Sequence, residues 1–187
     1  MRLAMRLAIM IAIIASFTAL CAAQDQGAYI SATALGQGTQ MGQNFLIQIS
    51  IREFSSTDDA NTLMDVFKSK GMKALSNALS RMKSIGNISM PSTTGYEIVY
   101  ARMFDTPNGK MIRIVTNRRI TPGEVISDSW TQDYSLTAIE FDLNNDGKNT
   151  GTLIPATMFK IDESGKIQVE AMQNPWRLTN IEYKPKK

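Results

Sequence analysis

Few residue types in this chain are able to carry out chemistry, and the missing types exclude whole classes of activity. The sequence contains no histidine, and its one cysteine is Cys21, close to the N-terminus. The chain therefore lacks the parts of Ser-His-Asp and Cys-His hydrolases, of zinc sites built on His or Cys, and of covalently attached haem. What remains is carboxylate acid–base catalysis, Ser-Lys nucleophiles and metal binding through oxygen.

The carboxylates do not form an obvious catalytic pair. Those in or beside predicted strands each fit the polar side of an alternating pattern; they are Glu97, Glu140, Asp142, Asp162 and Glu170. The one Ser-x-x-Lys match, Ser80 with Lys83, falls on the polar face of a predicted helix, and no Gly-rich phosphate loop is convincing. We therefore predict no catalytic residue and no cofactor.

One short stretch matches the opening of a calcium loop. Asp142, Asn144 and Asp146 place oxygen ligands at alternate positions before Gly147, but Leu153 stands where such a loop needs a bidentate glutamate. The flanking residues alternate like strands, so we interpret the stretch as a hairpin turn and predict no metal site. A weak calcium site is the alternative.

Candidate binding residues are more numerous than catalytic ones. The longest irregular segment in the middle of the chain, residues 117–133, combines arginine with tryptophan, a composition common in binding sites. Two further arginines are expected near each other across a predicted hairpin, where they are either solvated or ion-paired or form a basic patch inside a cavity. Two methionines belong to the apolar stripe of a predicted helix, where they either pack on the core or form a lid over an apolar ligand. The predicted ligand-binding residues are Arg102, Arg113, Arg118, Arg119, Trp130, Met72 and Met82.

The elements that would position these residues are mainly β-strands. Residues 43–54 alternate apolar and polar side chains, and Asn-Gly or Asp-Gly turns separate later pairs of alternating runs. The runs are 85–91, 96–104, 111–116, 134–144, 149–161, 166–172 and 176–183. Between the first strand and the rest, residues 57–83 carry a helix start at Ser55–Asp59 and helical apolar spacing on both sides of Gly71, which predicts a pair of short helices. We expect an α+β fold of mainly antiparallel strands, a curved sheet that is barrel-like or sandwich-like, with the helices packed on one face.

The N-terminus predicts export. Arg2 and Arg6 precede an apolar run that ends in Ala22 and Ala23, the pattern of a secretory signal peptide cleaved after residue 23. We expect a periplasmic or extracellular protein with no transmembrane segment after cleavage, and the minor alternative is lipid anchoring at Cys21. Residues 24–42, rich in Gly, Gln, Ser and Thr, are predicted as a flexible leader with a short strand possible at 29–34, and residues 43–187 as one domain.

The charge pattern argues against nucleic acid as a partner. The formal charge of +3 falls to +1 when Arg2 and Arg6 are removed, and the remaining charges of both signs are interspersed. This balance leaves an apolar small molecule or a cell-envelope component as the expected partner.

Several stretches together resemble a family of exported bacterial proteins of unknown function. They are IGNISMP at 85–91, YEIVYAR at 96–102, RIVTNRRI at 113–120, residues 136–162 and LTNI at 178–181. The resemblance spans roughly residues 43–183 and implies a strand, a helical pair and a run of hairpins. It implies no activity, cofactor or catalytic residue.

These observations favour a non-enzymatic exported protein that binds an apolar or amphipathic small molecule or an envelope partner, because curved antiparallel sheets with helical covers form concave apolar sites. One alternative is a carboxylate-dependent hydrolase of envelope polysaccharide, which would need two carboxylates in one cleft. The other is a structural or adhesive envelope component that uses a sheet edge.

Overall fold

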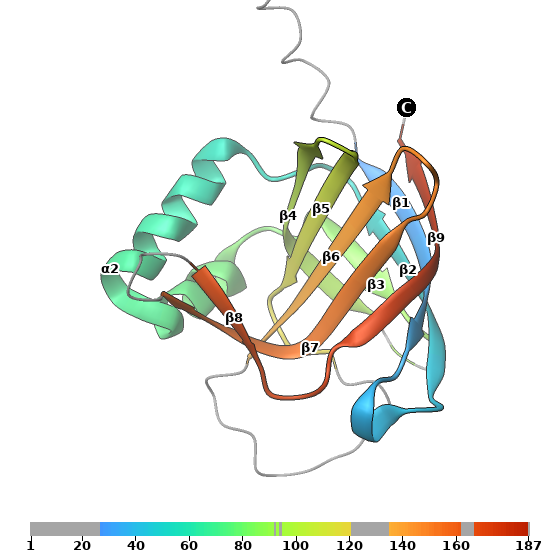
Figure 1. Ribbon diagram of the computed structural model, residues 1–187. Coiled ribbons are helices and arrows are strands. Elements are labelled where there is room, and N and C mark those ends of the chain that lie inside the picture. The colour runs from blue at the N-terminus through green and yellow to red at the C-terminus, as the bar shows by residue number, and fades with distance from the viewer. Residues whose placement is uncertain (1–26, 92, 94, 121–134, 162–166, 187) are drawn as a thin grey trace, which may run out of the picture.

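The fold is a closed antiparallel β-barrel with a bent helix on its outside (Figure 1). The computed structural model describes residues 27–91, 93, 95–120, 135–161 and 167–186. Its strands are β1 (Ala28–Leu35), β2 (Asn44–Ile51), β3 (Gly86–Ser89), β4 (Tyr96–Thr106), β5 (Gly109–Thr116), β6 (Leu136–Asn144), β7 (Thr150–Ile161), β8 (Ile167–Ala171) and β9 (Trp176–Pro185), with a 3-10 turn η1 (Gly38–Gln40) and helix α2 (Thr57–Arg81). The prediction of mainly antiparallel β structure is confirmed, and the barrel is the alternative that the structure adopts.

The barrel is closed by two long-range pairings, in which β9 pairs with β1 on one side and with β7 on the other. The strands lie in the order β6-β5-β4-β3-β2-β1-β9-β7-β8, and β6 also pairs with β7. Eight strands therefore form the ring, while β8 pairs with β7 outside it. Side chains from alternate positions fill the interior, with Ile47, Ile98, Ile112 and Phe141 all fully buried. An eight-stranded ring is just wide enough for such side chains to fill it.

Strand β1 occupies the middle of the flexible leader predicted at residues 24–42 and contains the short strand considered at 29–34. Ala28–Leu35 pairs with β2 on one side and β9 on the other, so this stretch is a barrel strand. Its inward positions are Ala28, Ile30, Ala32 and Ala34. Three of these four side chains are alanine, which has a low strand propensity, and the alternation is therefore weak in the sequence.

The prediction of a pair of short helices is wrong. A single element, α2, runs for 25 residues from a capping box at Ser56 and Asp59. Gly71 has φ 75° and ψ −170°, a conformation open to glycine, yet the chain resumes helical geometry directly after it. Gly71 itself is not helical, so α2 bends sharply there, and Leu75 and Leu79 beyond the bend pack into the same apolar cluster as Phe67 before it.

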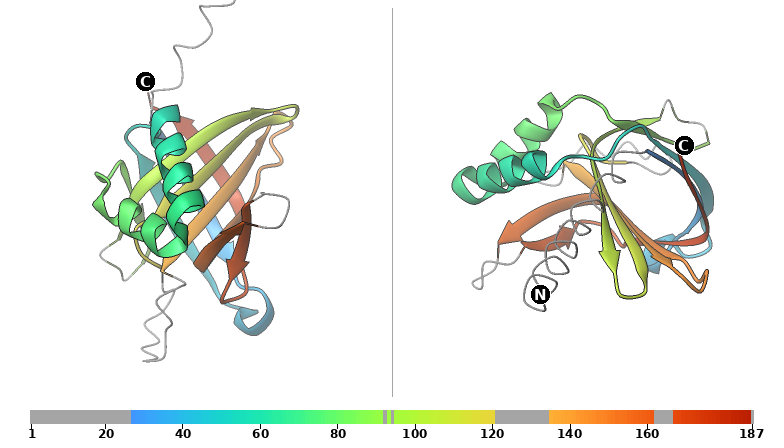
Figure 2. Two further views of the ribbon diagram at one scale, coloured as in Figure 1. Left: turned by 90° about the vertical axis from the view of Figure 1, so that its left-hand side faces the viewer. Right: turned by 90° about the horizontal axis from the view of Figure 1, so that it is seen from above.

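Strand β7 leaves the barrel half-way along its length. Pro155 cannot donate to the ladder, and the β6–β7 register shifts at this point, between Ile154 and Thr157. Beyond the shift, β7 pairs with β8 from Thr157 to Ile161. We call residues 158–161 of β7 together with β8 the β7–β8 arm; it projects on the same side of the barrel as α2 (Figure 2).

Candidate functional site

The largest recess that we describe lies outside the barrel, between α2, the outer face of β4–β7 and the β7–β8 arm. We call it the α2 groove; its volume is about 690 Å³, within the usual range for small-molecule sites. Its wall on α2 includes Leu63, Met64, Phe67, Leu75 and Leu79. Its floor and opposite wall include Tyr100, Arg102, Phe104, Arg113, Val115, Ala138, Glu140, Thr152, Ile154, Phe159, Ile167 and Val169.

The helix is held over the barrel by a second apolar cluster, distinct from the barrel interior. Phe67, Leu75 and Leu79 of α2 are buried against Val99 and Leu136. The rings of Phe67 and Phe159 also meet edge to face, 6.5 Å apart. Phe67, Leu75 and Leu79 of this cluster also line the groove, so part of its wall is continuous with buried apolar packing.

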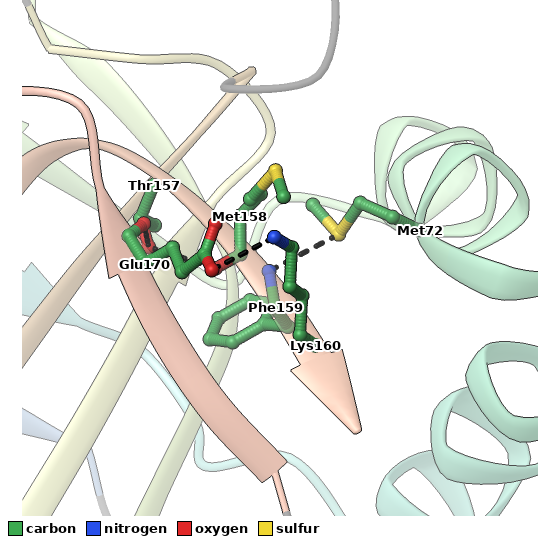
Figure 3. Close-up of polar contacts among 6 residues, drawn as sticks. All are labelled: Met72, Thr157, Met158, Phe159, Lys160 and Glu170. Carbon is green, nitrogen blue, oxygen red and sulfur yellow. Dashed lines mark hydrogen bonds and ion pairs between the residues drawn. The ribbon is translucent and has the colours of Figure 1, made fainter. Parts of the chain in front are cut away.

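The arm is tied to the helix through a backbone group that would otherwise be unpaired. The Phe159 backbone N–H donates to the Met72 sulfur at 3.4 Å (Figure 3). Within the arm, Lys160 and Glu170 form an ion pair at 2.8 Å between β7 and β8 (Figure 3). The first contact joins the arm to α2, and the second joins the two strands of the arm to each other.

Polar groups gather at one level of the groove. The Arg113 Nε atom donates to Glu140 Oε2 at 2.6 Å, and Arg102 Nη2 donates to Thr57 Oγ1 at 3.4 Å. Both guanidinium groups lie over the ring of Phe104, at 5.3 Å for Arg102 and 5.6 Å for Arg113. Burial raises the pKa of the neighbouring Tyr100, an effect that the charge of Arg102 partly opposes.

The structure brings together two of the predicted binding residues. Arg102 and Arg113 are directly opposite each other in the β4–β5 register, as the hairpin predicted, and both line the groove. Met72 and Met82 pack against the apolar cluster under the helix and do not line the groove. For these two methionines the structure shows packing, which is the first of the two roles considered.

The remaining predicted residues lie elsewhere. Arg118 donates to the Gly95 carbonyl at 2.9 Å and covers the ring of Tyr96. Arg119 is half-buried and does not line the groove. Trp130, with most of the predicted 117–133 loop, lies outside the described residues.

Sequence reasoning missed most of the groove lining. Tyr100, Ile154 and Val169 fall within the predicted strands and Phe67 within the predicted helices, and the sequence does not mark any of them as a binding residue. The sequences of β4 and β5 do contain a signal of a covered outer face, because aliphatic or aromatic side chains occupy both faces of these strands. In a barrel strand this pattern requires a cover on the outer face, and α2 supplies it.

Among the described residues, no two carboxylates face each other across the groove, and Asp162 lies outside the described residues. Glu140 is the one carboxylate among the described groove residues, and it is engaged by Arg113. Glu140 and Asp142 also border a smaller depression of about 280 Å³ on the outer face of β6. A two-carboxylate hydrolase needs its two carboxyl groups on opposite sides of a bound sugar. Glu140 and Asp142 instead lie side by side, two residues apart on the same face of β6.

The turn with the calcium-like spacing is stabilised by its own polar groups. The Asn144 side-chain amide donates to the Lys148 carbonyl at 2.7 Å, and Asp146 Oδ1 accepts from the Lys148 backbone N–H at 3.0 Å. In the part of the chain that the structure describes, three or more His, Cys, Asp or Glu side chains nowhere cluster as a metal site would require. The oxygens at Asn144 and Asp146 thus serve a hairpin turn.

Fold and groove together define the class: an eight-stranded antiparallel barrel with a filled interior and an external amphipathic groove under a bent helix. No protein-family model matches the chain, and neither a curated protein nor a solved structure matches it. Within the described ranges, helices of the length and apolar character needed to cross a bilayer are absent.

Proposed function

We propose that this protein is a non-enzymatic binding protein that holds an amphipathic small molecule in the α2 groove. The observation that carries this proposal is the composition of the groove: apolar walls on three sides with a small number of polar groups at one level. Such a recess, of about 690 Å³, has the size and lining typical of small-molecule sites. The predicted signal peptide at residues 1–23 would deliver the protein to the periplasm or the outside of the cell, where amphipathic molecules are abundant in the envelope.

Exposed apolar side chains at the groove support the same proposal. Ile167 and Val169 of β8 are 42% and 47% exposed although both border the recess. Large aliphatic side chains on one short strand gain little from this arrangement unless something covers them. A bound apolar chain would remove both from water.

Binding of a neutral fluorescent probe tests the proposal. N-phenyl-1-naphthylamine should fluoresce more strongly with the protein, because its emission increases in apolar surroundings. Val169→Gln should weaken binding about fivefold through loss of apolar contact. Leu46→Gln is the matched control, since Leu46 is also 47% exposed on a strand but lies away from the groove, and it should leave the affinity unchanged. Equal effects of the two substitutions, or no binding at all, would contradict the proposal.

A second candidate function is favoured by the edge of β8. Among the described strands, β8 pairs with β7 alone, so its other edge presents backbone groups that could join a strand from another molecule. This would suit a structural or adhesive component of the envelope. Sedimentation of the purified protein distinguishes the two functions. Self-association that increases with concentration supports strand pairing through the β8 edge, and a monomer at all concentrations contradicts it.

A further inference from the structure

We propose that the occupant of the α2 groove is a single-chain anionic amphiphile, whose head group binds Arg102 while its hydrocarbon chain lies along the apolar part of the groove. This inference rests on the proposed function and specifies its ligand class. Three features favour this ligand class: the order of side chains across the outer face of the barrel, the balance of charge at the arginines and the hydrogen-bond donors that Arg102 leaves available.

The strand register arranges the outer face in rows of different polarity. Arg102 is opposite Arg113, Arg113 is opposite Glu140, and Glu140 is opposite Thr152, so one polar row crosses β4, β5, β6 and β7. The adjacent row is apolar apart from one hydroxyl and consists of Tyr100, Val115, Ala138 and Ile154. Two residues along a strand separate the rows, a distance of roughly 7 Å.

The groove therefore changes from apolar to polar along the strand direction. The apolar row, together with Phe67 and Leu75 of α2 and Phe159 of the arm, forms the part in which a hydrocarbon chain would be removed from water. The polar row follows immediately. A molecule that satisfies both parts must have an apolar chain joined to a polar head.

The charge of the polar row favours a negative head. Two guanidinium groups face each other across the β4–β5 pair, an arrangement that is unfavourable for like charges. Glu140 neutralises Arg113, but Arg102 makes no ion pair with any carboxylate of the described residues. The nearby Asp59 carboxylate is committed to the helix cap, where Oδ2 accepts from the Ser56 backbone N–H at 2.9 Å and from its hydroxyl at 2.7 Å. One positive charge thus remains at the polar end of the groove.

Arg102 also has donors to spare. A guanidinium carries five N–H donors, of which Arg102 directs one toward the Tyr100 hydroxyl and another into a long contact with Thr57 Oγ1, at 3.4 Å, so donors remain for a ligand. Its guanidinium carbon lies 5.3 Å from the centre of the Phe104 ring, a contact that restricts the side chain before a ligand arrives. A carboxylate, sulfate or phosphate oxygen pair matches this fork with two parallel hydrogen bonds.

The test compares three detergents that share a twelve-carbon chain and differ in head group. Dodecanoate, dodecyl maltoside and dodecyltrimethylammonium are each titrated into the full chain by calorimetry, below their critical micelle concentrations. We expect dodecanoate to bind about tenfold more tightly than the maltoside, and the cation most weakly. The preference for dodecanoate should fall as salt is added, because the partly exposed charges are then screened.

Two substitutions with opposite effects identify the head-group residue. Arg102→Gln should weaken dodecanoate binding about tenfold and change maltoside binding less than about twofold. Glu140→Gln should strengthen dodecanoate binding about threefold, since it releases Arg113 from its ion pair. Arg81→Gln, at an exposed position at the end of α2 outside the groove, is the control and should behave as the wild type.

The outcomes separate this inference from the proposed function. If none of the three amphiphiles binds, the proposed function fails. If all three bind with equal affinity, or if Arg102→Gln and Arg81→Gln bind dodecanoate equally well, the groove binds an apolar chain and the proposed preference for an anionic head group is wrong. Binding that begins only above the critical micelle concentration would contradict the proposal of a single-chain ligand, because the protein would then be binding the surface of a micelle.

Discussion

Tyr100 reports on the environment of the groove at the scale of a single residue. Its ring belongs to the apolar row of the floor, and desolvation favours the neutral phenol, so burial raises its pKa above 10.0. The charges and hydrogen bond of Arg102, with a smaller contribution from Arg113, oppose this shift without cancelling it. Burial also raises the pKa of Tyr183.

These shifts predict a loss of stability in alkali. Above pH 10 the unfolded chain releases tyrosine protons that the folded chain still holds, so the free energy of unfolding falls as pH rises through this window. Tyr100→Phe should make that decline shallower, and Tyr100→Phe combined with Tyr183→Phe shallower still. Urea unfolding at several pH values between about 9 and 11 measures the slope. A slope unchanged by Tyr100→Phe would show that this phenol is equally solvated in both states.

The residue scale also shows what a sequence can predict about a site. The position of Arg102 opposite Arg113 is predictable from the Asn-Gly turn, because a tight turn fixes the register of the two strands it connects. The partnership of Arg113 with Glu140 did not follow, because it depends on the β5–β6 register across a long irregular connection. Short-range geometry was therefore predictable, and the charge balance that decides the proposed ligand class was not.

At the scale of elements, the bend in α2 shapes the groove. Residues before the bend supply most of the groove wall, whereas Met72 beside it accepts the hydrogen bond from the arm. The bend depends on Gly71, whose φ of 75° and ψ of −170° belong to a region that side chains with a Cβ rarely adopt. Space is not the constraint, because a Cβ at Gly71 would meet nothing within 4 Å.

Gly71→Ala should therefore destabilise the protein through backbone strain alone, by about 1–3 kcal/mol. If the helix instead straightens to relieve the strain, the groove changes shape and probe binding weakens together with stability. Thermal or urea unfolding gives the first quantity, and N-phenyl-1-naphthylamine titration gives the second. Lys73→Ala, an exposed change in the same helix, should stay within about 0.5 kcal/mol of the wild type. A Gly71→Ala protein as stable as this control would mean that the bend is not strained.

The elements that sequence analysis misjudged share a physical cause. A left-handed glycine ends many helices, but here the apolar stripe continues beyond Gly71, and tertiary packing kept the helix together. In β1, alanine at inward positions allows neighbouring strands to approach but carries little hydrophobic signal. Both errors arise because packing against distant parts of the chain outweighed local preference.

At the scale of the whole molecule, closure of the barrel depends on contacts that no local pattern records. β1 joins β9, its partner near the other end of the chain, and β9 joins β7 through residues 151–153 and 176–178 alone. The sequence could suggest a curved sheet but not choose between barrel and sandwich, because that choice is made by these two pairings. The short β7–β9 seam is the narrower of the two, and it borders the point where β7 turns outward to form the groove.

Gly151 tests the importance of that seam. An added Cβ would lie 2.8 Å from the Glu140 carbonyl oxygen, 3.0 Å from Phe141 Cδ1 and 3.2 Å from Leu178 Cβ, so β6, β7 and β9 would have to separate to admit it. We expect Gly151→Ala to cost about 1–3 kcal/mol by overpacking and to accelerate amide hydrogen exchange at the seam more than in β1 and β2. Thr150→Ala, at the exposed neighbouring position, should do neither. Uniformly faster exchange across the barrel would indicate that the strands open as one cooperative unit. An unchanged free energy of unfolding would contradict the prediction, because it would mean that the seam accommodates the added Cβ without strain. The expected local response would identify β7–β9 as the weakest joint of the ring, on the strand that also forms one wall of the groove.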